Sequence, residues 1–414
     1  MNQHLQKGGQ LFTFFSLYVA QKIPMAFFST VIPVIMRQQN FSLEVIGMLQ
    51  FLKLPWILKF LWSPAIDRSC NKVSDYKRWI FSSEIIYAVV IFSIAFLDLQ
   101  VTPALIIGLI ILAFIASATQ DIATDALAVI SFSDKDKSLV NSMQSMGGFA
   151  GTMIGSGGLL LIYHKMGWGN LLPYLALFVV IAVIPLLFFR GDESARLQLE
   201  AKKDMKKAGA NDLLGFFKQK GIWKQVVFLF LYYAGIIGTL SMFKPMLVDF
   251  GYDMKEIGVM VGIIGTSIGC LGSLFGGFIV RKIGRSWSRI IFAFTILLVT
   301  VYVFLLLVCL PVNTATLHLG VSLLWLSYGM ATIVVYTTAM DCVRKGYEGT
   351  DFTLQTVITH LSGMLMAVGA GKLAGTYGYT TLYFVEMLVA ALSFVYILLI
   401  FKNKKENVEP KYHR

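Results

Sequence analysis

The chain has 414 residues, of which 57% are hydrophobic and only 14% are charged, and its mean hydropathy is +0.71. Soluble proteins carry about 25% charged residues, so the composition excludes an ordinary soluble protein and predicts one that uses the bilayer as its solvent. The net charge of +12 could suggest a nucleic-acid partner. The basic residues lie in short segments between apolar runs, however, which argues against nucleic acid and indicates membrane orientation.

Apolar runs long enough to cross a bilayer follow one another along the whole chain. We therefore predict an all-α membrane protein with twelve transmembrane helices. The expected spans are 11–36, 43–66, 79–97, 102–130, 139–164, 170–190, 223–249, 254–280, 288–310, 313–341, 350–376 and 380–401. The first run is too long for the apolar region of a signal peptide, and we expect it to stay in the protein.

Only one predicted connection is long, and it divides the spans into six and six. This charged segment, 191–222, is expected to be a cytoplasmic linker between an N-terminal bundle, 1–190, and a C-terminal bundle, 223–401. Residues 402–414 would form a cytoplasmic tail.

The distribution of basic residues predicts the orientation of the chain. Of the 35 Lys and Arg residues, 27 lie in segments on the side of the N-terminus, three lie in the opposite loops, and five lie inside predicted helices. Cytoplasmic segments are enriched in Lys and Arg. We therefore expect both termini to be cytoplasmic.

Short basic turns follow the second and the eighth predicted helix. The first contains Asp67-Arg68, and the second is the run GFIVRKIGR at 277–285. Together with the layout of six plus six helices, these turns resemble the loop signature of the major facilitator superfamily, although Arg281 stands where the signature has Asp. The resemblance implies secondary transport through a site near the bilayer midplane between two halves. It also implies a cytoplasmic latch, which we assign to Lys59, Asp67, Arg68, Arg281, Lys282 and Arg285.

Three stretches resemble a narrower group, the AmpG-related permeases. Residues 59–68 (KFLWSPAIDR) and 118–125 (ATQDIATD) are similar to motifs in the second and fourth helices of that group. Residues 349–355 (GTDFTLQ) resemble the start of the eleventh helix in its siderophore-permease relatives, the RhtX/FptX type. The resemblance implies import across the bacterial inner membrane, with a ferric siderophore as the favoured solute and an anhydro-muropeptide as the alternative.

Ionisable residues inside predicted helices are the candidates for a transport pathway, because a charge at the bilayer centre costs about 2.5–3.5 kcal/mol and usually faces a cavity. Lys22 and Lys53 lie near the middle of the first two helices, and Asp121 and Asp125 share one face of the fourth at a spacing of four. The geometry of the helices allows Asp121 to form an ion pair with either Lys22 or Lys53. The lysines would attract an anionic solute, and one Asp would exchange a proton; a structural ion pair is the competing interpretation.

Uncharged polar residues extend this predicted pathway. Gln120 adjoins Asp121, and Gln144 and Gln355 occupy similar places near the starts of the fifth and eleventh helices. His360 lies in the middle of the eleventh, where a buried core histidine is the favoured alternative to a proton relay. Glycines spaced by four on the fifth and eighth helices predict close packing of these two helices across the two halves.

The sequence carries no nucleophile–base motif, metal-ligand spacing or phosphate-binding loop. We therefore expect no enzyme activity, no cofactor and no metal, and the expected partners are a small solute, the lipid bilayer and protons as coupling ion. Two other classes remain open. Drug efflux would favour aromatic and acidic groups over the two lysines, and a membrane receptor would favour a large extramembrane domain.

Overall fold

The computed structural model describes residues 2–38, 52, 54–98, 101–191, 195, 199–200, 208–209 and 211–401. All regular secondary structure in this part of the chain is helical. Eight of its helical segments are long and apolar enough to cross a membrane. Helices are expected for such runs, because a bilayer offers no water to the backbone and every N–H and C=O must bond within the segment. The count of twelve spans and the side of the termini stay predictions.

The chain folds into two compact units that do not follow a simple division at the linker. Unit 1 comprises Met1–Ser133, Gly147–Leu213 and Lys345–Thr353, and unit 2 comprises Asp134–Met146, Leu214–Arg344 and Leu354–Arg414. The predicted six-helix halves remain a prediction. Helices α7 (Lys137–Met153) and α19 (Glu348–Phe401) each contribute residues to both units.

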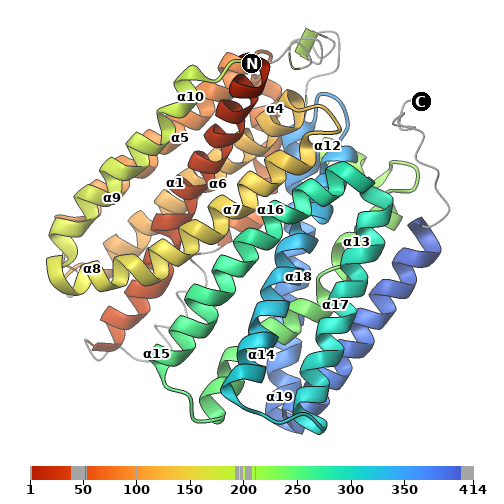
Figure 1. Cartoon of the computed structure of the whole chain (residues 1–414). Helices are drawn as coiled ribbons and strands as arrows, with labels where there is room; N and C mark the ends of the chain where they lie inside the picture. Colours follow the sequence, from red (N-terminus) through yellow and green to blue (C-terminus); the bar gives the residue numbers. More distant parts are fainter. Residues whose placement is uncertain are drawn as a thin grey trace. The chain divides into compact units, whose positions relative to one another are not determined.

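Unit 1 is built around four long helices that run side by side in Figure 1. These are α1 (Asn2–Gln38), α5 (Val73–Ile94), α6 (Pro103–Ser131) and α9 (Trp168–Val183). Its shorter segments are α3 (Leu54–Leu58), the 3₁₀ turn η2 (Lys59–Leu61), α4 (Ser63–Ser69), the π-helix η3 (Ile154–Gly158), α8 (Leu159–Met166) and α10 (Pro185–Phe188). A core of large apolar side chains joins the long helices, with Phe27 and Phe28 packed on the indole of Trp168.

Unit 2 is centred on α18 (Thr314–Asp341), which packs against α16 (Thr266–Ile283) and α17 (Arg285–Val308). Gly329 permits the close contact between α18 and α16, because a Cβ atom at this position would collide with the backbone of Gly269 on α16. The other segments are α13 (Ile222–Leu231), α14 (Ala234–Asp249), α15 (Met254–Ile257), the π-helix η4 (Gly258–Gly265) and most of α19. Gly378 has φ of 80° and breaks α19 into two helical runs. A short helix, α12 (Asn211–Phe217), lies where the two units meet in sequence.

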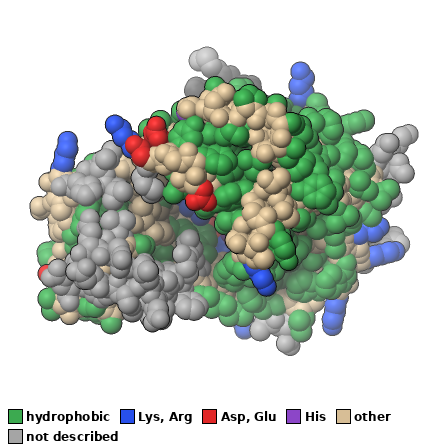
Figure 2. All heavy atoms as spheres, turned by 90° about the horizontal axis from the view of Figure 1, so that it is seen from below, with side chains coloured by type: hydrophobic (Ala, Val, Ile, Leu, Met, Phe, Trp, Pro, Cys, Tyr) green, Lys and Arg blue, Asp and Glu red, His purple; other side chains and the backbone are tan. Residues whose placement is uncertain are grey.

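Hydrophobic side chains cover much of the described surface, as the face drawn in Figure 2 shows. Large apolar residues on α9, such as Leu177 and Ile181, are more than half exposed, and so are Leu392 and Leu399 on α19. A water-soluble protein rarely exposes so much contiguous apolar surface. This surface is what a chain solvated by lipid requires.

The glycine ridge of α7 packs differently from the sequence prediction. Gly147, Gly151 and Gly155 lie against α1, where added Cβ atoms would collide with Tyr18, Lys22 and the backbone of Ile23. The predicted contact between the fifth and eighth helices is made by other residues: the hydroxyl of Ser142 on α7 donates to the backbone carbonyl of Ser273 on α16 at 2.9 Å, and a Cβ atom at Gly277 of α16 would collide with Ser142. Small residues allow close approach to any partner, so their spacing could not identify which helix the partner is.

Candidate functional site

The centre of unit 1 contains a buried ion pair between Lys59 of η2 and Asp121 of α6. The side chain of Lys59 is 1% exposed and that of Asp121 is 6% exposed. Asp121 lies more than four turns into α6, within a segment apolar enough to span a membrane. Each charge would be costly there alone, so each requires the other.

Polar side chains from α1 complete the hydrogen bonding of this pair. The amide Nε2 of Gln21 donates to Oδ1 of Asp121 at 2.9 Å and to Oε1 of Gln120 at 2.8 Å. One turn away, the hydroxyl of Tyr18 donates to the buried carboxylate of Asp125. The two acids predicted to share a face therefore both face α1, but they have different partners.

Lys22 lies beside this pair and is bonded differently. Its ammonium lies over the ring of Trp56, 4.2 Å from the ring centroid, whereas that of Lys59 lies 5.2 Å from the same ring. Its side chain is half-buried, and within the described residues no carboxylate lies at ion-pair distance from it. Lys22 is thus the cation of this cluster that has no carboxylate partner among the described residues.

The partner of Asp121 differs from the ones that the sequence suggested. The predicted candidates were Lys22 and Lys53, and Lys53 lies outside the described residues. Lys59 was assigned to the latch, but it contacts Asp121. The break between α3 and α4 at η2 brings Lys59 to α6, and helical spacing alone does not reveal such a turn.

Asp67, one of the two latch residues on α4, is buried and caps the start of α19. Its carboxylate accepts hydrogen bonds from the backbone N–H of Gly349 at 3.0 Å and from that of Thr350 at 2.6 Å. The Thr350 hydroxyl donates to it at 2.7 Å. A carboxylate at a helix N-terminus satisfies free N–H groups and is favoured by the helix dipole. Arg68, the next residue, is exposed.

In unit 2 the predicted latch residues of α16 and α17 form a separate network with acids. Arg281 pairs with Asp136 at 3.4 Å, and Arg285 pairs with Asp341 at the end of α18. Lys137 contacts the same Asp341 at 3.4 Å. Although Arg281 replaces the acid of the loop signature, Asp136 and Asp341 supply carboxylates from other segments. Lys282 is exposed and has no ion pair within the described part of the chain.

Asp134, in the turn before α7, belongs to the same network. Partial burial would raise the pKa of its carboxyl, but the Lys137 ammonium at 2.9 Å outweighs burial and lowers the pKa below its ordinary value. The backbone carbonyl of Asp134 accepts a hydrogen bond from Arg285 at 2.5 Å. This turn is therefore held by charge from two helices.

Three predicted pathway residues, Gln144, Gln355 and His360, belong to unit 2, whereas Lys59 and Asp121 belong to unit 1. Gln355 is fully buried, accepts a hydrogen bond from Gln225 at 3.0 Å and donates to the carbonyl of Ala339 at 2.9 Å. Gln144 is buried on α7. His360 is exposed on α19, so the expected core histidine is wrong.

The sequence analysis missed two participants in the cluster, Tyr18 and Trp56, and one buried acid, Glu84, on another helix of unit 1. Tyr18 and Trp56 read as ordinary helix aromatics, and only their contacts with Asp125 and Lys22 reveal a polar role. Glu84 on α5 was not among the predicted pathway residues, yet it is 1% exposed and neither carboxyl oxygen has a hydrogen-bond partner among the described residues. Its position inside an apolar helix was the available signal.

Comparison with protein families gives a match over most of the chain. The matching family model is described as Major Facilitator Superfamily and covers residues 10–367. Among individual proteins, the Anhydromuropeptide permease of Escherichia coli strain K12 is 22% identical over 92% of this chain and 77% of its own length. A putative transporter named AmpG 4 from Rickettsia conorii is 22% identical over 97% of this chain and 98% of its own length. An uncharacterised protein of Haemophilus influenzae is 24% identical over 93% of both chains.

Solved structures share the same fold at low sequence identity. The proton:xylose symporter XylE bound to 6-bromo-6-deoxy-D-glucose has a TM-score of 0.71 and 11% identity, with 97% of each chain covered. A bacterial homologue of the iron transporter ferroportin, in an outward-facing state with soaked iron, has a TM-score of 0.66 and 14% identity, with 96% of this chain and 99% of that chain covered.

Proposed function

This chain belongs to the Major Facilitator Superfamily, and from that premise we propose that it is a permease that imports an organic anion of the anhydro-muropeptide class across the cytoplasmic membrane. The coarser statement is established by the family: the protein is an integral membrane transporter for a small-molecule solute and is not an enzyme. The substrate class, the direction of transport, the inner-membrane location and the coupling ion are the proposal.

The observation that carries the proposal is the setting of Lys22. It lies near the middle of the apolar segment Lys7–Pro33 of α1. The neighbouring acid, Asp121, is already paired with Lys59. Because an ammonium inside a membrane protein is costly without a counter-charge, an anionic group of the solute is the natural partner for Lys22. The relatives named as anhydromuropeptide permeases support this solute class, because muropeptides carry carboxylates.

Proton coupling is assigned to Asp121 in this proposal. Protonation of its carboxylate removes the charge that holds Lys59, so Lys59 becomes available to the solute together with Lys22. Release of the proton restores the ion pair and displaces the anion. Glu84 is the competing proton carrier, because a buried carboxyl without a partner avoids a large cost when it is protonated.

The latch assigned to Asp67 has a physical basis in the cap that it forms on α19. The cap consists of hydrogen bonds to backbone groups that are otherwise unsatisfied. In our proposal this cap opens and closes during alternating access between two six-helix halves, 1–190 and 223–401. Gln355, six residues after Gly349 on the same helix, would move with it.

Ligand-induced thermal stabilisation of the purified protein in detergent tests the substrate class. A ligand that binds only the folded state must raise the melting temperature. We expect a 1,6-anhydro-muropeptide to raise it and a ferric siderophore to leave it unchanged. The siderophore is the informative competitor, because residues 349–355 resemble siderophore permeases. A shift with the siderophore alone would refute the muropeptide assignment.

Uptake of the labelled ligand into proteoliposomes tests the roles of the residues. Lys22→Met removes the charge that has no acidic partner in the cluster and should abolish uptake, whereas Lys372→Met, at an exposed lysine of α19, is the matched control and should retain it. Asp121→Asn should lose the dependence of uptake on a pH gradient, and Glu84→Gln should keep it. The reverse result for the last two variants would assign the proton to Glu84.

A further inference from the structure

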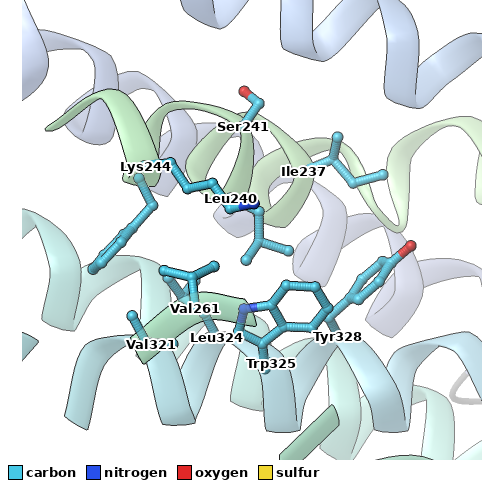
Figure 3. A pocket seen from close by; sticks show the side chains of 10 residues that line it. Ile237, Leu240, Ser241, Lys244, Val261, Val321, Leu324, Trp325 and Tyr328 are labelled. Carbon is cyan, nitrogen blue, oxygen red and sulfur yellow. The ribbon is translucent and has the colours of Figure 1, made fainter. Parts of the chain in front are cut away.

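Unit 2 contains a cavity of about 400 Å³ that belongs to none of the groups described above. It lies between α14, the π-helix η4 and α18 (Figure 3). Its volume falls within the range of about 300–1,000 Å³ typical of small-molecule sites. The lining residues are Ile237, Leu240, Ser241, Phe243, Lys244, Val261, Val321, Leu324, Trp325 and Tyr328.

One wall of this cavity is aromatic. Trp325 and Tyr328 are three residues apart on α18, so they share one face of the helix, and Figure 3 shows both on the side opposite α14. Their ring centroids are 6.1 Å apart, and a second tyrosine, Tyr233, packs on Tyr328 at 5.6 Å. This support limits the movement of Tyr328. A rigid aromatic wall of this kind suits a ring with a flat apolar face.

The opposite wall supplies a single cation. Lys244 of α14 extends along the cavity toward Leu240 in Figure 3. Its side chain is exposed, and no carboxylate of the described residues lies within ion-pair distance of it. None of the ten lining residues is acidic. The cavity therefore presents an uncompensated positive charge, which disfavours a cationic ligand and favours an anionic one.

The backbone of η4 is adapted to this arrangement. A Cβ atom at Gly265 would lie 2.6 Å from the indole Nε1 of Trp325 and 3.0 Å from Val321, so only glycine leaves the indole in its observed place. The π-helical turn, Gly258–Gly265, also brings Val261 to the cavity. Most π-helical turns in proteins are short bulges inside α-helices, and they are frequent at functional sites.

We propose that this cavity binds a cyclic organic acid, with the ring against Trp325 and Tyr328 and the acid group on the Lys244 ammonium. The inference rests on the proposed function in one respect, because the acid would be part of the transported solute. It adds a second anion contact, in unit 2, to the one that Lys22 provides in unit 1. The ring can come from an acidic sugar or from an aromatic acid, and both share this chemistry.

Matched probe pairs separate the ring from the charge. N-acetylmuramic acid and N-acetylglucosamine share a sugar ring and differ in a carboxylate-bearing group, and salicylate and salicylamide do the same for an aromatic ring. Binding to the full-length protein in detergent is measured by calorimetry. We expect at least one acid to bind at least tenfold more tightly than its neutral partner. The pair that shows the difference identifies the source of the ring. Equal binding within both pairs, or binding of acetate as tight as that of the acids, would overturn the proposal.

Variants then locate the binding. Lys244→Met and Trp325→Leu should each weaken the preferred acid at least tenfold, and Lys244→Arg should retain it. Trp223→Leu, at a tryptophan that is 62% exposed, is the matched control and should bind as the wild type does. Gly265→Ala keeps every lining side chain but displaces the indole, so it should weaken binding even if Trp325→Leu fails to fold. Unchanged binding in Lys244→Met and Gly265→Ala would refute the site.

Failure of this site is distinguishable from failure of the proposed function. If the wild type transports the muropeptide and the Lys244→Met variant does so with unchanged affinity, the cavity inference fails and the proposed function stands. If the acid probe binds in a Lys244-dependent manner but the muropeptide neither binds nor is transported, the cavity inference stands and the substrate assignment fails.

Discussion

The lysines of unit 1 and the lysine of the unit 2 cavity have opposite surroundings. Lys59 is 1% exposed and bonded to Asp121, and Lys22 packs beside it on Trp56. Lys244 is exposed on a cavity wall with no acid among the lining residues. In unit 1 the charges and the packing support each other, so function there is tied to folding. In unit 2 the Lys244 ammonium makes no ion pair within the described residues, so folding does not depend on it and we assign it to ligand binding.

Removal of Lys59 should produce the largest effect, because it leaves the Asp121 carboxylate buried without its cation. We expect Lys59→Met to reduce the free energy of unfolding by about 3–5 kcal/mol and to abolish uptake. Thermal unfolding in detergent measures the loss. The double variant Lys59→Met with Asp121→Asn should recover most of the stability, since no charge is left unpaired. Wild-type stability in the single variant would contradict the pair.

The second largest loss of stability should follow the addition of a methyl group between α7 and α1. An added Cβ at Gly151 would lie 2.7 Å from the Cβ of Lys22, so Gly151→Ala should cost about 1–3 kcal/mol of unfolding free energy and impair uptake by displacing Lys22. Gly148→Ala is the matched control on the same helix, because no atom lies within 4 Å of its added Cβ. Equal stability of the two variants would show that α7 does not pack on α1 in this way.

Loss of the cap on α19 should reduce the free energy of unfolding by less than Lys59→Met or Gly151→Ala does. Asp67→Ala removes the acceptor for the N–H groups of Gly349 and Thr350, and we expect a loss of about 0.5–2 kcal/mol in unfolding free energy. Arg68→Ala, at the exposed neighbour, should change it little. Thermal unfolding of the two variants compares them directly. A larger loss for Arg68→Ala would reject the assignment of the cap to Asp67.

The turn before α7 should respond weakly to pH. The pKa of Asp134 is lowered in the folded protein, so its contribution is present above its ordinary pKa near 3.9 and is lost as the pH falls through the lowered value. The side chain is 54% exposed, and such pairs contribute at most about 1 kcal/mol. Asp134→Asn should therefore flatten the acid limb of the stability profile slightly. An unchanged limb would show that this carboxylate does not couple to folding.

The smallest change in stability should follow Lys244→Met. This exposed side chain has no ionic partner in the described residues, so we expect a change in unfolding free energy within about 0.5 kcal/mol, although binding of the cyclic acid should weaken at least tenfold. This variant is the sharpest test of the contrast between the two units. A loss comparable to that of Lys59→Met would mean that Lys244 belongs to a structural network and that the contrast is wrong.

Several features of the site could be predicted from the sequence, and others could not. The spacing of Asp121 and Asp125 predicted a shared helix face, and both acids do face α1. The motif around Asp67 pointed to a latch residue, but its acceptor role at the start of α19 joins residues 282 positions apart. Pairings over such distances depend on how helices pack, and the helical period of a single segment carries no information about its neighbours.

The sequence by itself determined the solvent of this protein, its helical class and its superfamily. Long apolar runs have one stable solution in a bilayer, because every backbone hydrogen bond must be made within the segment. Only the tertiary structure decided that Asp121 binds Lys59, that the α7 glycines pack on α1, and that an aromatic wall faces Lys244. Many helix packings satisfy the same apolar pattern, and the choice among them rests on side-chain fit and on where buried charges find their partners.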